Sequence, residues 1–261
     1  MENNSILTFD NVSMHFGGVR AIDNLSFEVK RYEIVGIIGP NGAGKTTVFN
    51  VLSGVYIPTS GDIIFNGKKI NNLPAHTIIN SGIARTFQNI RIFGSMSVLD
   101  NVRVAFFGRT KYNLIDIFIN SKNKKNEEAL LEKEALDLLQ EVGLIEKAHL
   151  PANSLPYGDQ RRLEIARALA CKPEILLLDE PAAGMNPNEI DDLNKNIVAI
   201  KEKFGLTVLL VEHQMRLIMG VCERIIVMNF GKSLAVGTPV EIRNHKEVLE
   251  AYLGKVHKYE K

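Results

Sequence analysis

The stretch that decides the fold reads Gly39-Pro40-Asn41-Gly42-Ala43-Gly44-Lys45-Thr46. It follows the apolar run at residues 34–38 and precedes a helical pattern at 47–52. A glycine-rich turn between a strand and a helix points backbone N–H groups and the helix N-terminus at phosphates. Lys45 adds a positive charge for the β- and γ-phosphates, and the Thr46 hydroxyl is a ligand for Mg²⁺. The sequence therefore predicts that residues 39–46, with Thr47 after them, bind ATP and Mg²⁺.

The composition is that of an ordinary globular protein. The chain has 261 residues, of which 45% are hydrophobic and 23% charged, and its formal net charge is +1. This balance gives no indication of a nucleic-acid partner. The first five residues lack a basic segment leading into an apolar one, and the longest apolar runs are the length of strands. We therefore expect a chain that neither spans a membrane nor is exported.

The two cysteines, Cys171 and Cys222, form no CxxC pair and have no histidine at ligand spacing. A zinc site and a disulfide framework are therefore not indicated. We expect both to be buried, reduced thiols.

The chain changes character along its length. Residues 6–65 carry short β-rich runs, the turn pair Asn66-Gly67 follows them, and one helix after Lys45 interrupts them. From residue 74 to about 150 the apolar spacing becomes helical, most clearly at 98–106 and 129–142. After Asp159, strands alternate with helices, which indicates a mainly parallel sheet. The expected elements are strands at 174–178, 207–211 and 224–228 and a helix at 188–203.

Residues 108–126 look like an insertion within the helical part. An apolar cluster at 114–119 precedes the basic, Asn-rich stretch 122–126. A solvated loop or short helix is the first interpretation, and a surface for docking a partner is the alternative.

A second chemical feature is the apolar run 175–178, which ends in Asp179 and Glu180. In a parallel sheet these carboxylates lie at the C-terminal edge of the strands, beside the phosphate loop. Asp179 is suited to interact with Mg²⁺ in the outer coordination sphere of the ion, and Glu180 is suited to activate a water molecule. A buried strand that merely ends in acidic residues is the alternative, and the phosphate loop argues against it.

A third segment precedes this strand, and it resembles the signature segment of ATP-binding-cassette (ABC) ATPases. It reads Leu155-Pro156-Tyr157-Gly158-Asp159-Gln160-Arg161-Arg162-Leu163-Glu164-Ile165-Ala166-Arg167-Ala168-Leu169. The resemblance extends over essentially the whole chain: Phe16 resembles the aromatic that stacks on adenine, Gln88 the Q-loop glutamine, residues 182–186 the D-loop and His213 the switch histidine.

The resemblance implies an ABC ATPase fold: a RecA-like P-loop core with a mainly parallel sheet, an N-terminal antiparallel β-subdomain and an inserted α-helical subdomain. The whole chain, 1–261, would be one domain, with its core at about 1–87 and 171–261. Residues 88–170 would form the helical subdomain, with the insertion and the signature.

The resemblance also implies roles for single residues. Phe16 would stack on adenine, an interaction of roughly 1 to 3 kcal/mol, unless it is a core residue at the end of a strand. Gln88 would bind Mg²⁺ or the attacking water through its amide oxygen. His213 would donate a hydrogen bond to the γ-phosphate, with a plain surface histidine as the alternative. Catalysis would then rest on Lys45, Gln88, Glu180 and His213.

The sequence departs from the commonest family pattern in two places. In the signature, which usually reads Leu-Ser-Gly-Gly-Gln, Pro156 replaces serine, Tyr157 the first glycine and Asp159 glutamine. Family cassettes pair head to tail, so the signature residues Tyr157, Gly158 and Asp159 would contact the nucleotide of the second subunit. Pro156 stands where the pattern has serine and offers neither a hydroxyl nor an N–H. We therefore expect the signature segment of this chain to make a weaker contact with the nucleotide of the second subunit. Asn186 replaces the usual D-loop aspartate, so an acceptor stays but the charge is lost.

Other segments resemble one branch, the ATP-binding subunits of bacterial branched-chain amino acid importers. They are residues 83–93, the Leu-Pro-Tyr-Gly stretch at 155–158, 180–187, and 237–254. The resemblance implies a peripheral protein on the cytoplasmic face of the membrane, bound to permease subunits and to a second cassette, and only indirectly to a substrate-binding protein. It implies little ATPase activity from the chain alone.

Several alternatives remain open at this point. A cassette for urea, amide or lipopolysaccharide transport is the nearest. A non-transport ABC ATPase would carry tandem cassettes or long coiled-coil arms, which the sequence lacks. A lone P-loop kinase would lack the signature, and a cassette that binds ATP without turnover would not need Glu180 and His213.

Overall fold

The computed structural model describes residues 4–109 and 122–253. They divide into two compact units. One unit holds the residues up to Ile78 and those from Leu177 onward, and the other holds residues 79–176. Each unit is described below by itself.

The first unit contains an antiparallel sheet, as the family resemblance implied. Its strands run in the order β2-β1-β4-β5, and Phe9 of β1 stacks on Phe27 of β2 with ring centroids 4.4 Å apart. The Asn66-Gly67 turn has positive φ at both residues, 49° and 72°, which matches the twist of the hairpin. The strands are β1 Ser5–Phe16, β2 Val19–Lys30, β4 Ser60–Phe65 and β5 Lys68–Lys69, and the first three correspond to the short β-rich runs that the sequence indicated within residues 6–65.

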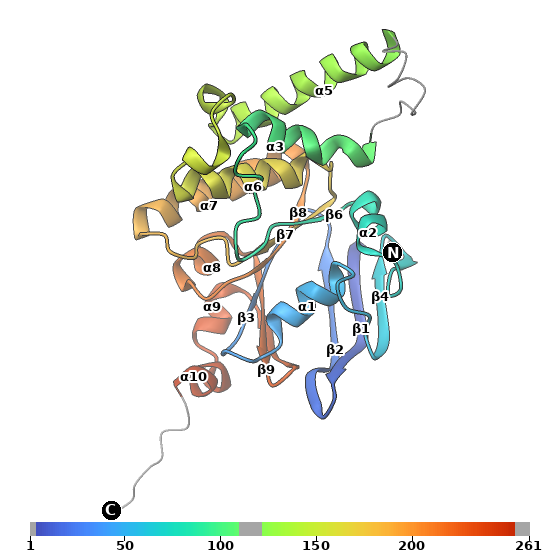
Figure 1. Ribbon diagram of the computed structural model, residues 1–261. Helices are drawn as coiled ribbons and strands as arrows, with labels where there is room; N and C mark the ends of the chain where they lie inside the picture. Colours follow the sequence, from blue (N-terminus) through green and yellow to red (C-terminus); the bar gives the residue numbers. More distant parts are fainter. Residues whose placement is uncertain (1–3, 110–121, 254–261) are drawn as a thin grey trace, which may run out of the picture. The chain divides into compact units, whose positions relative to one another are not determined.

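The first unit also carries the predicted, mainly parallel sheet (Figure 1), with strand order β10-β9-β3-β8-β7. The central strand β3, Ile34–Ile38, is fully buried and pairs in parallel with both β8 and β9. A run of β-branched residues that only Gly36 interrupts suits a strand that is covered on both faces. The other strands are β7 Ile175–Asp179, β8 Thr207–Val211, β9 Arg224–Asn229 and β10 Lys232–Gly237.

Helices of the first unit follow the strands closely. In α7, the buried residues Ile190, Leu193, Ile197 and Ile200 recur at helical spacing, and α7 packs on α8. The sequence analysis did not identify the antiparallel strand β10 or the short helices after it. The bounds are α1 Lys45–Leu52, α2 Ala75–Ser81, α7 Pro187–Phe204, α8 Met215–Val221, α9 Pro239–Arg243 and α10 Lys246–Leu253.

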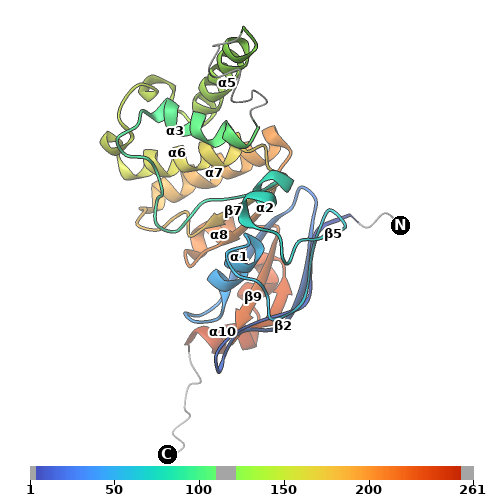
Figure 2. The same ribbon diagram turned by 45° about the vertical axis from the view of Figure 1, so that its right-hand side comes forward.

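The second unit is largely helical, as predicted. Figures 1 and 2 show α3, α5 and α6 lying together, and their buried side chains include Val102, Leu139 and Leu163. The Gly82 carbonyl accepts hydrogen bonds from the N–H groups of Glu174 and Ile175, which holds β6 beside the start of β7. The bounds are β6 Ile83–Arg85, α3 Val98–Val104, α5 Lys122–Glu141 and α6 Tyr157–Ala170, with 3₁₀ turns at Ala105–Arg109, Ile145–Lys147 and Ala152–Ser154.

Most of the insertion, residues 110–121, lies outside the described residues, but residues 122–126 form the start of the 20-residue helix α5.

Cys222 is buried, and burial raises the pKa of its thiol to about 12. The prediction that Cys171 is buried was wrong, because it caps the C-terminus of α6 and is partly exposed there. Within the described ranges, no helix has the length and apolar character to cross a membrane.

Asn186, which the sequence analysis compared with the D-loop of ABC ATPases, is the N-cap of α7. Its side chain accepts hydrogen bonds from the N–H groups of Asn188 (3.0 Å) and Glu189 (3.1 Å), and Glu189 accepts one from the Asn186 N–H (2.8 Å). This reciprocal capping box satisfies N–H groups that have no partner inside the helix. Asn186 thus has a structural task that the sequence analysis did not assign to it.

Replacing Asn186 by alanine should lower the free energy of unfolding by about 1 kcal/mol, because the cap is lost. Asn186→Asp should stay within about 0.5 kcal/mol of the parent, because a carboxylate caps equally well. Asn196→Ala, an exposed change within the same helix, is the control and should not destabilise. Urea unfolding of the three variants measures this, and equal stability of Asn186→Ala and the parent would contradict it.

Candidate functional site

The phosphate loop lies in a backbone cradle of the first unit. A Cβ added to Gly39, where φ is +157°, would come within 2.2 Å of the Met228 carbonyl, and one added to Gly44 within 2.2 Å of the Ala21 carbonyl. The Ala43 carbonyl also accepts a hydrogen bond of 3.0 Å from the Gly231 N–H. Only glycine allows this approach. The loop therefore packs directly against β2, against β9 and against the turn between β9 and β10.

Lys45 lies inside the curl of the loop. Its Nζ donates hydrogen bonds to the carbonyls of Gly39 (2.7 Å) and Pro40 (3.0 Å), and the side chain is buried. Burial lowers the pKa of the Lys45 ammonium, and the negative charge of Glu180 acts in the opposite direction. Lys45 and Glu180 therefore share one electrostatic environment.

The first turn of α1 is suited to bind an anion. Its N-cap is Gly44, which makes no side-chain cap. The N–H groups at the start of such a helix, together with the helix dipole, attract phosphate. Thr46 is exposed and Thr47 partly exposed in this turn, so the structure brings residues 39–47 together as the sequence predicted.

Asp179 and Glu180 follow β7 at the same edge of the sheet. Asp179 is buried, whereas Glu180 is partly exposed and has φ of +45°, a conformation that side chains other than glycine adopt at a cost of about 1 to 3 kcal/mol. The Glu180 N–H donates to the Val211 carbonyl at the end of β8, at 2.9 Å. This bond brings Glu180 to His213, whose Nε2 lies 3.0 Å from Glu180 Oε1. His213 is exposed, and Glu180 is the acidic group next to it.

Glu212 holds this corner together, and the sequence analysis missed it. It is buried, and its carboxylate accepts hydrogen bonds from the N–H groups of Ala182 (2.8 Å), His213 (2.6 Å) and Gln214 (2.8 Å). It thus ties the turn after β7 to the turn after β8. Its place directly after the buried strand 207–211 was a signal that could have identified it.

Phe16 ends β1 with 42% of its surface exposed. The alternative interpretation, a core phenylalanine, was therefore wrong. Its ring meets the edge of Tyr56 at a centroid distance of 5.1 Å and an interplanar angle of 76°. A ring held in this way and open on one side is available to stack on a base.

In the second unit, a buried ion pair organises the backbone around Gln88. Arg161 is fully buried, and it donates to Glu164 (2.9 Å) and to the carbonyls of Phe87 (2.6 Å) and Gln88 (3.0 Å). Glu164 accepts from the Phe87 N–H (3.1 Å). Burial raises the pKa of Glu164, although these hydrogen bonds and the charge of Arg161 oppose the rise. Arg161 and Glu164, both missed by sequence reasoning, join the backbone of Phe87 and Gln88 to helix α6.

The signature residues lie at the start of α6, where Pro156 is the N-cap without a side-chain cap. Tyr157 is exposed, and its hydroxyl oxygen accepts a hydrogen bond from Arg161 at 3.2 Å. An added Cβ at Gly158 would meet nothing within 4 Å, so the backbone there is open to approach.

Asp159 is placed differently from what the sequence suggested. It is buried and forms ion pairs with Lys147 and Arg162. Burial would raise the pKa of its carboxyl, but these two partners hold that pKa below its ordinary value. Because two cations already balance the charge, little repulsion toward a phosphate is left.

Breaking the buried pair by Arg161→Met should lower the free energy of unfolding by about 3 to 5 kcal/mol, because Glu164 is left as an unpaired buried acid. The double variant Arg161→Met/Glu164→Met should lose less than the sum of the two single variants. The control is Lys195→Met, which breaks the exposed pair with Asp192 and should cost less than about 1 kcal/mol. Urea unfolding tests the cycle, and strictly additive losses would count against the pair.

Comparisons with known proteins identify the family to which the chain is similar. A family model described as ABC transporter matches residues 22–183, and one described as branched-chain amino acid ATP-binding cassette transporter matches residues 232–258. The chain is 45% identical over 250 residues to the high-affinity branched-chain amino acid transport ATP-binding protein LivG of Salmonella typhimurium, covering 96% of this chain and 98% of LivG. It is also 45% identical to BraF of Pseudomonas aeruginosa, a protein of the same description, with the same coverage.

Solved structures give the same result. The ADP conformation of an ATP-binding cassette of an ABC transporter is similar with a TM-score of 0.83 and 29% identity, covering 96% of this chain and 99% of that one. A dimeric post-hydrolysis cassette bound to ADP and Pi is similar with a TM-score of 0.74 and 26% identity, covering 89% and 98%. The chain therefore belongs to the ABC transporter family, as an ATP-binding and ATP-hydrolysing cassette.

Proposed function

We propose that this cassette powers an importer of branched-chain amino acids. The observation that carries the ATPase part is the meeting of Glu180 and His213, 3.0 Å apart, in the electrostatic environment of the phosphate-loop lysine. The solute is inferred from the relatives LivG and BraF and from the match at residues 232–258.

The residues of the first unit divide the work of hydrolysis. The N–H groups of the loop and the Lys45 ammonium hold the phosphates, and the exposed ring of Phe16 stacks on adenine. Glu180 accepts a proton from the attacking water, because its carboxylate lies at the strand edge and is partly exposed. His213 holds that carboxylate and donates to the γ-phosphate when nucleotide is bound. The hydrogen bonds of Glu212 keep the side chains of Glu180 and His213 in position.

A magnesium ion fits the donor atoms of this site. No three His, Cys, Asp or Glu side chains gather as a metal-binding group in residues 4–109 and 122–253. The ion would take its ligands from the Thr46 hydroxyl, the phosphates and water, with Asp179 in its outer coordination sphere and the Gln88 amide oxygen as a proposed further ligand. These are the hard oxygen donors that Mg²⁺ prefers. When bound, it neutralises charge on the phosphates.

The partner is a second cassette in a head-to-tail dimer. Tyr157 and the open backbone at Gly158 contact the nucleotide held by the partner, while Asp159 serves its own subdomain. Dimeric structures of similar cassettes support this arrangement. The whole chain acts as one domain, with residues 88–170 as the helical subdomain that docks on permease subunits at the cytoplasmic face of the membrane. A substrate-binding protein takes part only through those subunits.

Glu180→Gln in the assembled transporter should lower the rate of ATP hydrolysis by at least about 100-fold, because the amide cannot accept the proton. ATP binding should persist, since the side chain keeps its shape. Glu202→Gln, an exposed change on α7, is the control and should hydrolyse ATP like the parent. Phosphate release measures both, and a parental rate in Glu180→Gln would rule out Glu180 as the base.

Vesicles that contain the assembled transporter and its binding protein should accumulate labelled leucine when ATP is supplied on the cassette side. Unlabelled isoleucine and valine should compete, and urea and acetamide should not. A complex with Lys45→Ala should accumulate none, because the phosphates lose their positive partner. Uptake of urea or an amide instead of leucine, or outward movement of lipopolysaccharide, would assign the cassette to another solute.

A further inference from the structure

Tyr56 supports the exposed ring of Phe16 from one side. The centroids of the two rings lie 5.1 Å apart and their planes make an angle of 76°, which is an edge-to-face contact. Aromatic rings prefer this arrangement, and it fixes the direction in which each ring faces. Tyr56 itself is only partly exposed. The sequence analysis assigned it no role.

The hairpin turn after Phe16 adds no side chain that could hold the ring. Phe16 is the last residue of β1, and Gly17 and Gly18 lead into β2. An added Cβ at either glycine would meet no atom of the described residues within 4 Å, so the turn is open to solvent. Because glycine allows many backbone conformations, the direction of the Phe16 ring depends on what packs against the ring itself.

The segment that carries Tyr56 is anchored at both of its ends. The Tyr56 N–H donates a hydrogen bond to the Asn50 carbonyl in α1, at 3.2 Å. Three residues later, the Thr59 N–H donates to the Ser13 carbonyl of β1 (2.8 Å), and the Thr59 hydroxyl accepts from the His15 N–H (3.0 Å). Tyr56 is thus held between helix α1 and the end of strand β1.

This anchoring connects the ring of Phe16 to the phosphate loop. α1 begins at Lys45, where its first N–H groups face an anion, and the Tyr56 segment follows the other end of the same helix. A nucleotide that is held by its phosphates at one point and by its base at another needs a fixed separation between the two. The helix and the Tyr56 segment supply that connection.

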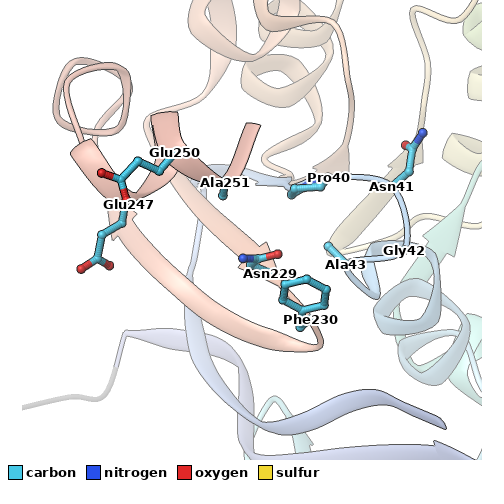
Figure 3. Close-up of a pocket in the computed structure, with 9 residues that line it drawn as sticks. All are labelled: Pro40, Asn41, Gly42, Ala43, Asn229, Phe230, Glu247, Glu250 and Ala251. Atoms are coloured by element: carbon cyan, nitrogen blue, oxygen red, sulfur yellow. The ribbon is translucent and has the colours of Figure 1, made fainter. Parts of the chain in front are cut away.

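A second exposed ring near the loop is less suited to the base. Phe230, which is 84% exposed, lines a pocket of about 440 Å³ with residues 40–43 of the loop and with α10 (Figure 3). Glu247 and Glu250 of α10 also line this pocket, and their negative charges oppose the approach of phosphates. Phe16 is therefore the ring placed for a nucleotide base.

We propose that Tyr56 is a positioning residue for the adenine base: its ring holds the Phe16 ring in the direction that stacking requires. The inference rests on the stacking of Phe16 on adenine proposed above, and it is independent of the transported solute. A ring that is already held loses less conformational freedom when the base binds. Tyr56 therefore strengthens the binding of the base, whereas the phosphates depend on the loop.

The test compares the binding of Mg·ATP and of magnesium tripolyphosphate, which has the phosphates but no base, to the full chain. Tyr56→Ala should raise the Kd of ATP about 2- to 10-fold, because the Phe16 ring is left free to turn. It should leave the Kd of tripolyphosphate unchanged. Tyr56→Phe, which keeps the ring, should restore the affinity for ATP. Ile57→Ala, at a neighbour that is 63% exposed, is the control and should change neither Kd.

Phe16→Ala separates this role from stacking itself. It should weaken ATP binding, and Tyr56→Ala added to it should have no further effect, because no ring is left to hold. If Phe16→Ala leaves the Kd of ATP unchanged, the stacking is wrong and the role of Tyr56 with it. If Phe16→Ala weakens ATP binding and Tyr56→Ala does not, the stacking stands and the role of Tyr56 is overturned.

An equal rise of both Kd values in Tyr56→Ala would also overturn the proposal, because the loss would then concern the phosphate loop. Should Tyr56→Ala fold poorly, Tyr56→Val, which keeps a branched apolar side chain without a ring, is measured against the same two ligands with the same expected split.

Discussion

Two close contacts between the phosphate loop and neighbouring backbone carbonyls determine where the other groups of this site lie. The phosphate loop lies so close to the Met228 and Ala21 carbonyls that no side chain larger than glycine fits at Gly39 or Gly44. The same approach fixes the start of α1, and with it the N–H groups that face an anion. It also places the Gly39 and Pro40 carbonyls where Lys45 can bind them. The loop is thus a cradle made largely of backbone groups and packed against strands β2 and β9.

The corner that holds Glu180 and His213 is assembled from the ends of neighbouring strands. The Glu180 N–H meets the Val211 carbonyl, and Glu212 binds three N–H groups on both sides of the gap between β7 and β8. These bonds hold Glu180 in a left-handed backbone conformation and bring it to His213. Groups that are held in advance need no rearrangement at the moment of reaction, which makes them effective at stabilising charge.

The core of the fold could be predicted because strongly apolar runs and a glycine-rich turn have few alternatives. The strands at 34–38 and 207–211 were identified to the residue. β10 was missed because its residues are half exposed and do not alternate, and α9 and α10 because they are short. Local pattern carries little signal for elements of this kind.

The roles of charged residues were harder to predict than the fold. Arg161, Glu164 and Glu212 act on backbone groups that are distant in the sequence, such as the Phe87 carbonyl. From its place in the signature, Asp159 was predicted to contact the nucleotide of the second subunit. In the structure it forms ion pairs with Lys147 and Arg162 of its own unit.

The central claim is that this chain holds half of an ATPase site, which a second cassette completes. The most direct test is the rate of ATP hydrolysis per chain, measured over a range of chain concentrations and again in the assembled transporter. The account predicts little hydrolysis by the dilute chain, a rate per chain that rises with concentration, and a further large rise on assembly. A high rate per chain that is independent of concentration and of assembly would contradict it.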